Sequence, residues 1–417
     1  MFEFGKDLRR LFERARDSDD LAWLELISTI LVENEARHQS IESGRVSCPN
    51  PHEACLRASQ IWRELARRTG NPQSLRRAEA EARAASRHAV NDEQTIKAFL
   101  ELAQSSLLAF DLSGGLERLR TADKLMATLP TPRRAHLAVM ITAIEARICA
   151  RRAVLSGAPE TIGTACDGLE RVVQSLKSHH RPVDVELQIE QAALSLEIGL
   201  TTRDLKRLEK AGQDLRNLIE NAPSDQKPIT RARALALCGV GMRALSSIAN
   251  DEVARQQAES LMDAATDQFT MDHSPLDWAA IQLMRPDRSD SLSLITLLQV
   301  EALTAQDGLI IGAEARERRL SQEIDDCEQS SDLFGLRHLE AHLLGRLRDI
   351  NTPMPPLDWA WSQIGLARIA LARSRLTGQT LGNVGMMLIE AGDTAREQGA
   401  VGLSNRARDL LPHPTTV

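Results

Sequence analysis

The sequence predicts an all-α fold in which antiparallel helical hairpins stack side by side as an α-solenoid. Three observations favour it: a recurring string, a composition of helix formers, and a regular alternation of amphipathic stretches with turn residues. The string Pro-Leu-Asp-Trp-Ala-Ala-Ile-Gln at 275–282 returns as Pro-Leu-Asp-Trp-Ala-Trp-Ser-Gln at 356–363, with six identities at a displacement of 81 residues. A fixed displacement is typical of repeat proteins, and this one equals two helical hairpins of about 34 to 45 residues each.

The composition supports an elongated helical array. The chain has 417 residues, more than the roughly 250 to 300 at which a single compact core stops growing. Tyrosine is absent and aromatic residues make up 3%. The dominant residues Ala, Leu, Arg and Glu form helices readily and strands poorly. No stretch of strict apolar and polar alternation bounded by turn residues indicates a sheet.

The charge and the termini bear on partners and compartment. The net charge of −7 and pI near 5.9 give no overall attraction for nucleic acid or anionic lipid, so we expect neither as a partner. We find no signal peptide and expect no membrane span. Six scattered cysteines are no disulfide framework. We therefore expect a cytoplasmic protein, and the predominance of arginine (only 7 of 51 basic residues are lysine) suggests a GC-rich bacterial genome.

Residues 1–45 are predicted to form an N-terminal helical extension. A first helix near 5–16 is followed by a second near 20–38, and a break at 41–51 contains two prolines and a glycine. We expect the first helix to cap the array, because the end of a repeat array exposes apolar surface that must be covered. Contact with another chain is the alternative. The apolar stripe of this helix consists of Phe4, Leu8, Leu11 and Phe12.

A regular array of hairpins is predicted over residues 50–271. Prolines 132, 182, 228 and 275 precede alternate helices at steps of 50, 46 and 47 residues, which again makes the unit a two-helix hairpin. Each hairpin has an apolar face that it cannot bury alone, so stacking drives the fold. The expected helices are 53–69, 72–89, 92–111, 114–128, 133–155, 159–178, 183–198, 202–221, 228–248 and 250–270.

The region 272–417 is predicted to contain further hairpins of less even length. Its first helix begins at Pro275 and is stopped early by Met284-Arg-Pro286. We expect the last residues, from Pro412, to fray. The remaining helices are expected near 290–306, 311–330, 332–349, 357–376 and 380–397.

The recurring Pro-Leu-Asp-Trp-Ala-x-x-Gln string, followed by an amphipathic helix, resembles bacterial tetratricopeptide-repeat (TPR) proteins. The resemblance is specific over 276–300 and 357–376. The Pro286 stop and steps longer than the 34 residues typical of the family depart from its pattern. The resemblance implies a concave groove that receives an extended peptide or a helix. In the register set by Gln363, Trp361 and Arg368 would face that groove. A second register, Trp361-x-x-Ile364-Gly365, also matches the family, and packing of Trp359 and Trp361 between hairpins is the alternative role.

Two constellations are candidates for metal sites. His338 and His342 have the i, i+4 spacing of zinc helices, but the leucines of this segment predict a buried face opposite to both histidines. Cys48-Pro-Asn-Pro-His52-Glu-Ala-Cys55 offers two thiols and an imidazole without a fourth ligand. We interpret the histidines as an exposed pair, and the cysteines as one loop residue and one buried residue. No metal or cofactor is expected.

The arginines between residues 53 and 88 form a basic run that could contact an acidic partner or RNA. No aromatic residues interleave with them for base stacking, so we interpret the run as a solvated helix face. Its members are Arg57, Arg63, Arg67, Arg68, Arg76, Arg77, Arg83 and Arg87.

These patterns predict a non-enzymatic adaptor that docks protein or peptide partners in the groove, with Trp361, Arg368, Phe4, Leu8 and Phe12 as candidate contacts. A zinc-dependent enzyme and a regulator that senses a peptide or nucleic acid are the alternatives. The partner, the pathway and the oligomeric state do not follow from the sequence.

Overall fold

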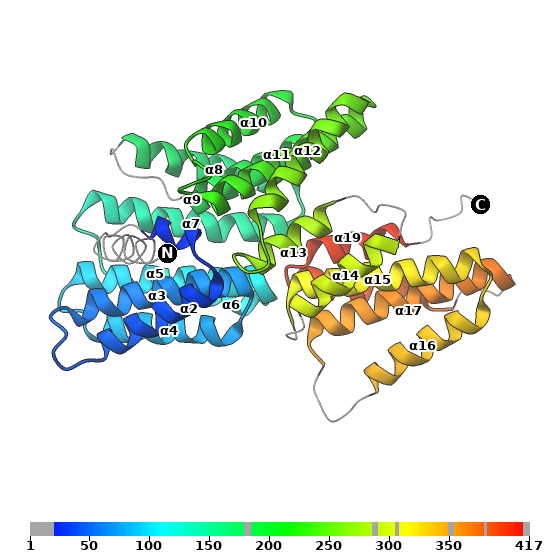
Figure 1. Cartoon of the computed structure of the whole chain (residues 1–417), viewed down its shortest axis with the longest axis horizontal. Helices are drawn as coiled ribbons and strands as arrows, with labels where there is room; N and C mark the ends of the chain where they lie inside the picture. The colour runs from blue at the N-terminus through cyan, green and yellow to red at the C-terminus, as the bar shows by residue number, and fades with distance from the viewer. Residues whose placement is uncertain are drawn as a thin grey trace, which may run out of the picture. The chain divides into compact units, whose positions relative to one another are not determined.

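The computed structural model describes residues 21–178, 185–285, 291–304, 308–348, 354–378 and 382–411. Within these ranges the secondary structure consists of eighteen α-helices and one 3-10 helix, without a strand (Figure 1). Neighbouring helices contact one another in chain order. The predicted all-α solenoid of stacked hairpins is therefore confirmed.

The first half of the chain contains eleven of these elements. They are η1 (Ala22–Leu26), α2 (Thr29–Ser43), α3 (Pro51–Thr69), α4 (Pro72–Arg87), α5 (Asp92–Ser113), α6 (Leu116–Ala127), α7 (Ala135–Ser156), α8 (Pro159–Ser178), α9 (Val185–Thr202), α10 (Leu205–Glu220) and α11 (Pro228–Ala249).

The second half contains the other eight described helices. They are α12 (Glu252–Gln268), α13 (Pro275–Met284), α14 (Ser291–Leu303), α15 (Ile310–Gln329), α16 (Leu333–Leu347), α17 (Pro356–Thr377), α18 (Val384–Glu397) and α19 (Val401–Asp409).

The chain divides into two compact units. Unit 1 comprises Met1–Leu102, Leu129–Ala150 and Pro159–Ile281, and unit 2 comprises Ala103–Thr128, Arg151–Ala158 and Gln282–Val417. The predicted boundaries at 45–50 and 271–272 stay predictions.

Hairpin packing follows the same rule in both units. A helix contacts its neighbours along the chain, as α10 does with α9 and α11, and it also meets the helix two places on, as α9 meets α11 and α15 meets α17. The apolar residues of α8 lie mostly on one buried face. The buried residues of this face are Ile162, Cys166, Leu169, Val172, Val173 and Leu176.

The predicted helix 20–38 is wrong in its details. The segment forms the short η1, an extended break at Ile27 and Ser28, and then α2, which runs on to Ser43. The break turns the carbonyl of Ile27 toward Arg68, whose guanidinium donates to it at 3.1 Å. A tertiary contact therefore decides the break. The break predicted at 41–51 is shorter than expected, because Pro51 occupies the first turn of α3, where no N–H is required.

Helix α19 was not predicted. Leu403 and Ala407 bury one side of this helix, and Arg406 forms an ion pair with Glu317 of α15. Nine residues give too short a periodic pattern for assignment from the sequence, so tertiary packing decides this helix.

Helix α11 is long and apolar enough to cross a membrane by length and composition, a property that the sequence patterns above did not predict. Core helices of soluble proteins have the same length and composition. This helix contacts η1, α9, α10 and α12, and its Arg233 forms ion pairs with Glu186 and Asp277. These contacts favour a core helix of unit 1.

Candidate functional site

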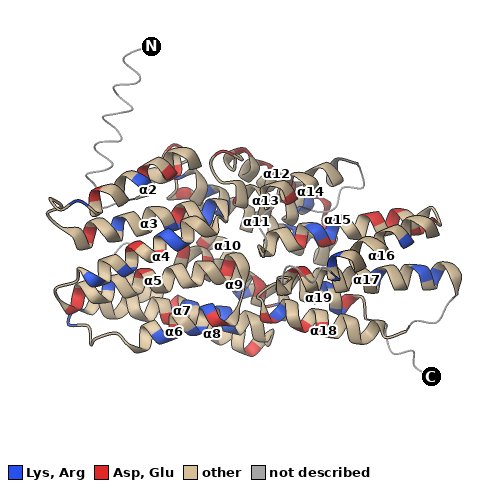
Figure 2. Ribbon diagram, turned by 90° about the horizontal axis from the view of Figure 1, so that it is seen from below, with Lys and Arg blue, Asp and Glu red and all other residues tan. Residues whose placement is uncertain are grey.

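Several ion pairs join helices two places apart in the chain, at a sequence separation of about one hairpin. Arg147 of α7, for example, binds both carboxylate oxygens of Glu190 of α9, 43 residues away, at 2.7 to 3.0 Å. Figure 2 shows basic and acidic residues interspersed along the helices, as such pairing requires. Further pairs with separations of 38 to 47 residues include Arg63–Glu101, Lys97–Glu53, Arg151–Asp111, Arg233–Glu186, Arg233–Asp277, Arg368–Asp325 and Arg375–Glu328.

The acidic residue of the recurring string takes part in this pattern in both copies. Asp277 accepts from Arg233, 44 residues earlier, at 3.1 Å. Asp358 accepts from Arg316, 42 residues earlier, at 3.0 Å. The repeated motif therefore supplies the same stacking contact at two places, one in each unit.

Trp361, a predicted groove residue, lies in the core of unit 2 with 3% of its surface exposed. Its Nε1 donates to Asp358 at 3.0 Å, and the guanidiniums of Arg316 and Arg346 lie 5.9 and 5.1 Å from its ring centre. This placement corresponds to packing between hairpins, the alternative that the sequence left open, and little of the side chain remains for a partner.

Arg368, the second predicted groove residue, lies on the α15 side of α17. It donates to both carboxylate oxygens of Asp325 and to the hydroxyl of Ser321, and 25% of its side chain is exposed. Phe4, Leu8 and Phe12 lie outside the described residues.

The residues of the two candidate metal constellations lie where the interpretations without a metal predict. His338 and His342 are exposed on α16, opposite the buried Leu336 and Leu343. Among the residues that the structure describes, no group of three or more His, Cys, Asp or Glu side chains could hold a metal ion.

The two cysteines of the Cys48–Cys55 segment are one loop residue and one buried residue, as interpreted from the sequence. Cys48 is half-buried and Cys55 is buried. His52 is buried too, with Nδ1 at 2.9 Å from the carbonyl oxygen of Ala85. Burial raises the pKa of the Cys55 thiol, which disfavours the reactive thiolate.

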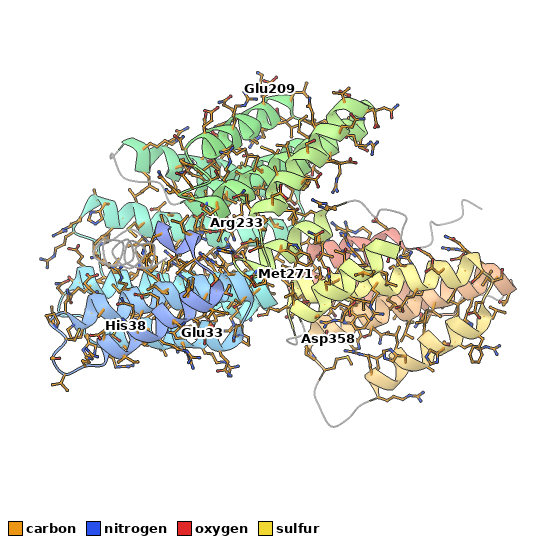
Figure 3. All side chains as sticks on the ribbon, in the orientation of Figure 1. Glu33, His38, Glu209, Arg233, Met271 and Asp358 are labelled. Atoms are coloured by element: carbon orange, nitrogen blue, oxygen red, sulfur yellow. The ribbon has the colours of Figure 1, made fainter. Side chains whose placement is uncertain are left out.

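The main polar feature of unit 1 is a charge cluster of three arginines and three carboxylates, at the junction of α3 with α9, α11 and α13. Arg67 of α3 donates to Asp277 of α13 at 2.9 Å and to Glu64 at 2.8 Å. Arg233 of α11, labelled in Figure 3, links the same Asp277 to Glu186 of α9. The members of the cluster are Glu64, Arg67, Arg68, Glu186, Arg233 and Asp277.

Further polar contacts surround this cluster, and some of them join segments more than 200 residues apart. Arg68 has no exposed surface and donates to Glu64 at 2.6 Å and to the carbonyl oxygens of Ile27 and His273. Glu25 of η1 accepts from the backbone N–H and the hydroxyl of Thr230, in the first turn of α11. A carboxylate at this end of a helix is favoured, because the N–H groups there lack partners within the helix.

The cluster holds two of its carboxylates, Asp277 and Glu64, in the charged form. Burial raises the pKa of Asp277, but the Arg233 and Arg67 guanidiniums outweigh this effect and hold the pKa at about 2. Glu64 behaves likewise: burial raises its pKa, and Arg67 and Arg68 bring it well below the usual range. Burial lowers the pKa of Arg68, and Glu64 offsets this only in part. Perturbed groups occur both at functional sites and in structural ion-pair networks.

The interpretation of the arginine run as a solvated face is wrong for three of its members. Arg63, Arg67 and Arg68 are bound to Glu101, Asp277 and Glu64, and Arg68 is fully buried. Sequence reasoning missed this cluster because two of its carboxylates, Glu186 and Asp277, lie far along the chain from α3. The spacing of 44 residues between Arg233 and Asp277 was the one available signal.

No protein-family model matches the chain, and no curated protein matches it significantly. Its architecture and these contacts are therefore what point to a function.

Proposed function

We propose that this chain is a non-enzymatic scaffold of TPR-like hairpins that docks a protein or peptide partner in the cytoplasm of a bacterium. The observation that carries the proposal is the shared role of Asp277 and Asp358. Each binds an arginine on the helix two places earlier, so the one strong repeat in the sequence serves to stack hairpins. Proteins built in this way offer extended surfaces that bind partners.

The polar side chains of the array support the same proposal. The ion pairs at hairpin spacing use arginines and carboxylates to hold helices against one another. The most perturbed carboxylates, Glu64 and Asp277, are held charged by arginines. A general acid or base requires a pKa near the working pH, and these two groups are shifted away from it.

Affinity purification of the full chain from the lysate of its native host tests the proposal. We expect the wild-type chain to retain one protein in near-stoichiometric amount, and Arg368→Ala to retain less, because Arg368 is partly exposed on α17. Arg120→Ala is the matched control, since Arg120 is an exposed arginine paired with Glu117 on α6. Equal retention by both variants would exclude the groove assigned to α17.

The alternative of a zinc-dependent enzyme predicts that the purified protein contains zinc, whereas the scaffold proposal predicts that it does not. Stoichiometric zinc that is lost in His342→Ala would overturn the scaffold proposal. We expect no salt-sensitive retention on heparin, because the chain is acidic. Such retention would favour the regulator that senses nucleic acid.

A further inference from the structure

The segment at the start of the described chain meets α11–α13 through polar contacts. This first segment consists of η1, α2 and α3. Thr29 donates its backbone N–H to the carbonyl oxygen of Asp272 at 2.8 Å, and its hydroxyl donates to the same oxygen at 3.0 Å. The Glu25–Thr230 and Arg67–Asp277 contacts lie beside it. Each of these contacts spans more than 200 residues of sequence.

Two hydrophobic clusters lie on either side of these polar contacts, and neither includes a residue of the other side. The first cluster is built from η1 to α4, and the second from α11 to α13. The first contains Leu24, Ile27, Val32, Ala36, Ile61, Trp62, Leu65 and Ala78. The second contains Ile229, Ala232, Leu235, Ala236, Met262, Ala265, Phe269 and Ile281. Separation of the two sides leaves both clusters intact when α4, which supplies Ala78 and packs on α3, moves with the first segment.

The contact between the first segment and α11–α13 also includes a feature that lowers stability. The second terminal nitrogen of Arg68 is buried without a hydrogen-bond partner, and an unsatisfied buried donor costs stability. Buried ion pairs gain little net stability because desolvation opposes the attraction between the charges. Polar interfaces between segments of one chain are typical of parts that move relative to each other.

From these observations we propose that the first segment is a releasable latch. It closes on α11–α13 through Glu25, Thr29, Arg67 and Arg68, and its release exposes the polar faces of α3, α11 and α13. These faces are then available to the partner, a consequence that rests on the proposed function. The latch itself does not require a partner, so its test is independent of that function.

Hydrogen exchange at two backbone amides reports the latch directly. The N–H groups of Thr29 and Thr230 each donate across the interface, to Asp272 and to Glu25. Both residues lie in the first turn of a helix, where the helix supplies no acceptor. Their exchange, resolved by mass spectrometry with electron-transfer fragmentation, therefore follows release of the latch. Amides in the middle of α11, such as that of Leu235, exchange only when the helix itself opens.

In the wild-type full chain we expect the Thr29 and Thr230 amides to exchange at least about 100-fold faster than the Leu235 amide. Arg67→Gln should accelerate the exchange of the Thr29 and Thr230 amides by a further factor of about 10 or more. Arg63→Gln is the matched control, because Arg63 lies one turn earlier on α3 and pairs with Glu101 within the array. Arg63→Gln should leave the exchange rates of the Thr29 and Thr230 amides unchanged.

Two results would overturn the latch. Exchange of Thr29 and Thr230 at the rate of Leu235 would mean that the segment separates only when unit 1 unfolds. Equal acceleration by Arg67→Gln and Arg63→Gln would mean that the interface has no special dependence on its cross-segment ion pairs. Circular dichroism confirms that each variant is folded before exchange is measured.

Discussion

Replacement of Asp277 by asparagine should destabilise unit 1 by removing the charge that Arg67 and Arg233 share. The pKa of Asp277 falls from an ordinary 3.8 to about 2 in the folded chain. A lowering of the pKa from 3.8 to about 2 corresponds to about 2 to 3 kcal/mol, at about 1.4 kcal/mol for each pH unit. Removal of one partner from a buried pair costs about 3 to 5 kcal/mol. We expect a loss of about 2 kcal/mol, at the low end of these figures, because the asparagine amide oxygen would still accept hydrogen bonds and the Asp277 side chain is 15% exposed.

Thiol labelling in urea measures this effect within unit 1. Cys166 is 1% exposed and belongs to unit 1, so its thiol reacts only when that part of the chain opens. At a fixed urea concentration, a loss of about 2 kcal/mol should accelerate its labelling about 30-fold. Asp272→Asn is the control, because Asp272 contacts Thr29 through its backbone carbonyl. It should change stability by less than about 0.5 kcal/mol.

The difference in stability between wild type and Asp277→Asn should depend on pH in a defined direction. A carboxylate whose folded pKa lies below its unfolded pKa stabilises the fold above the unfolded value, and this contribution is lost as the pH falls through the folded value. For Asp277 the window runs from 3.8 down to about 2. The stability gap between wild type and Asp277→Asn should stay constant from about pH 7 to about pH 5 and close below pH 3.8. Equal stability of the two proteins at neutral pH would refute the assigned role of Asp277.

Three further outcomes are expected. Trp361→Ala should cost about 3 to 5 kcal/mol in thermal unfolding because the ring is buried, whereas Arg368→Ala should cost less than about 1 kcal/mol, as its pair with Asp325 is partly exposed. In the native protein the exposed Cys149 should react with iodoacetamide much faster than the buried Cys55, whose pKa is raised. Purified protein should contain no stoichiometric zinc, and His342→Ala should leave its metal content unchanged.

Much of the fold follows from local patterns in the sequence. The expected helix 159–178 has the bounds of α8, and Pro228 and Pro275 begin α11 and α13. The displacement of 81 residues equals two hairpins, from α13 to α17. These elements are predictable because their caps, prolines and apolar stripes lie within a single helix.

The elements that sequence analysis missed depend on distant contacts. The break at Ile27 and Ser28 places one carbonyl against Arg68, and α19 is held by burial and by the pair of Arg406 with Glu317. No local pattern encodes either contact.

The candidate site was predictable only in part. The sequence identified the string that contains Asp277, but its partners Arg67 and Arg233 lie 210 and 44 residues away. Trp361 illustrates the opposite problem: its pattern suits both a groove and a core, and only its packing against Asp358 and two arginines distinguishes them.

A double-mutant cycle on Arg147 and Glu190 tests most directly whether ion pairs one hairpin apart stack this array. The two residues lie 43 positions apart on α7 and α9 and share three hydrogen bonds. Arg147→Met, Glu190→Gln and the double variant, compared by urea unfolding, should give a coupling free energy of about 1 to 3 kcal/mol. Strictly additive effects of the two substitutions would contradict the stacking contact.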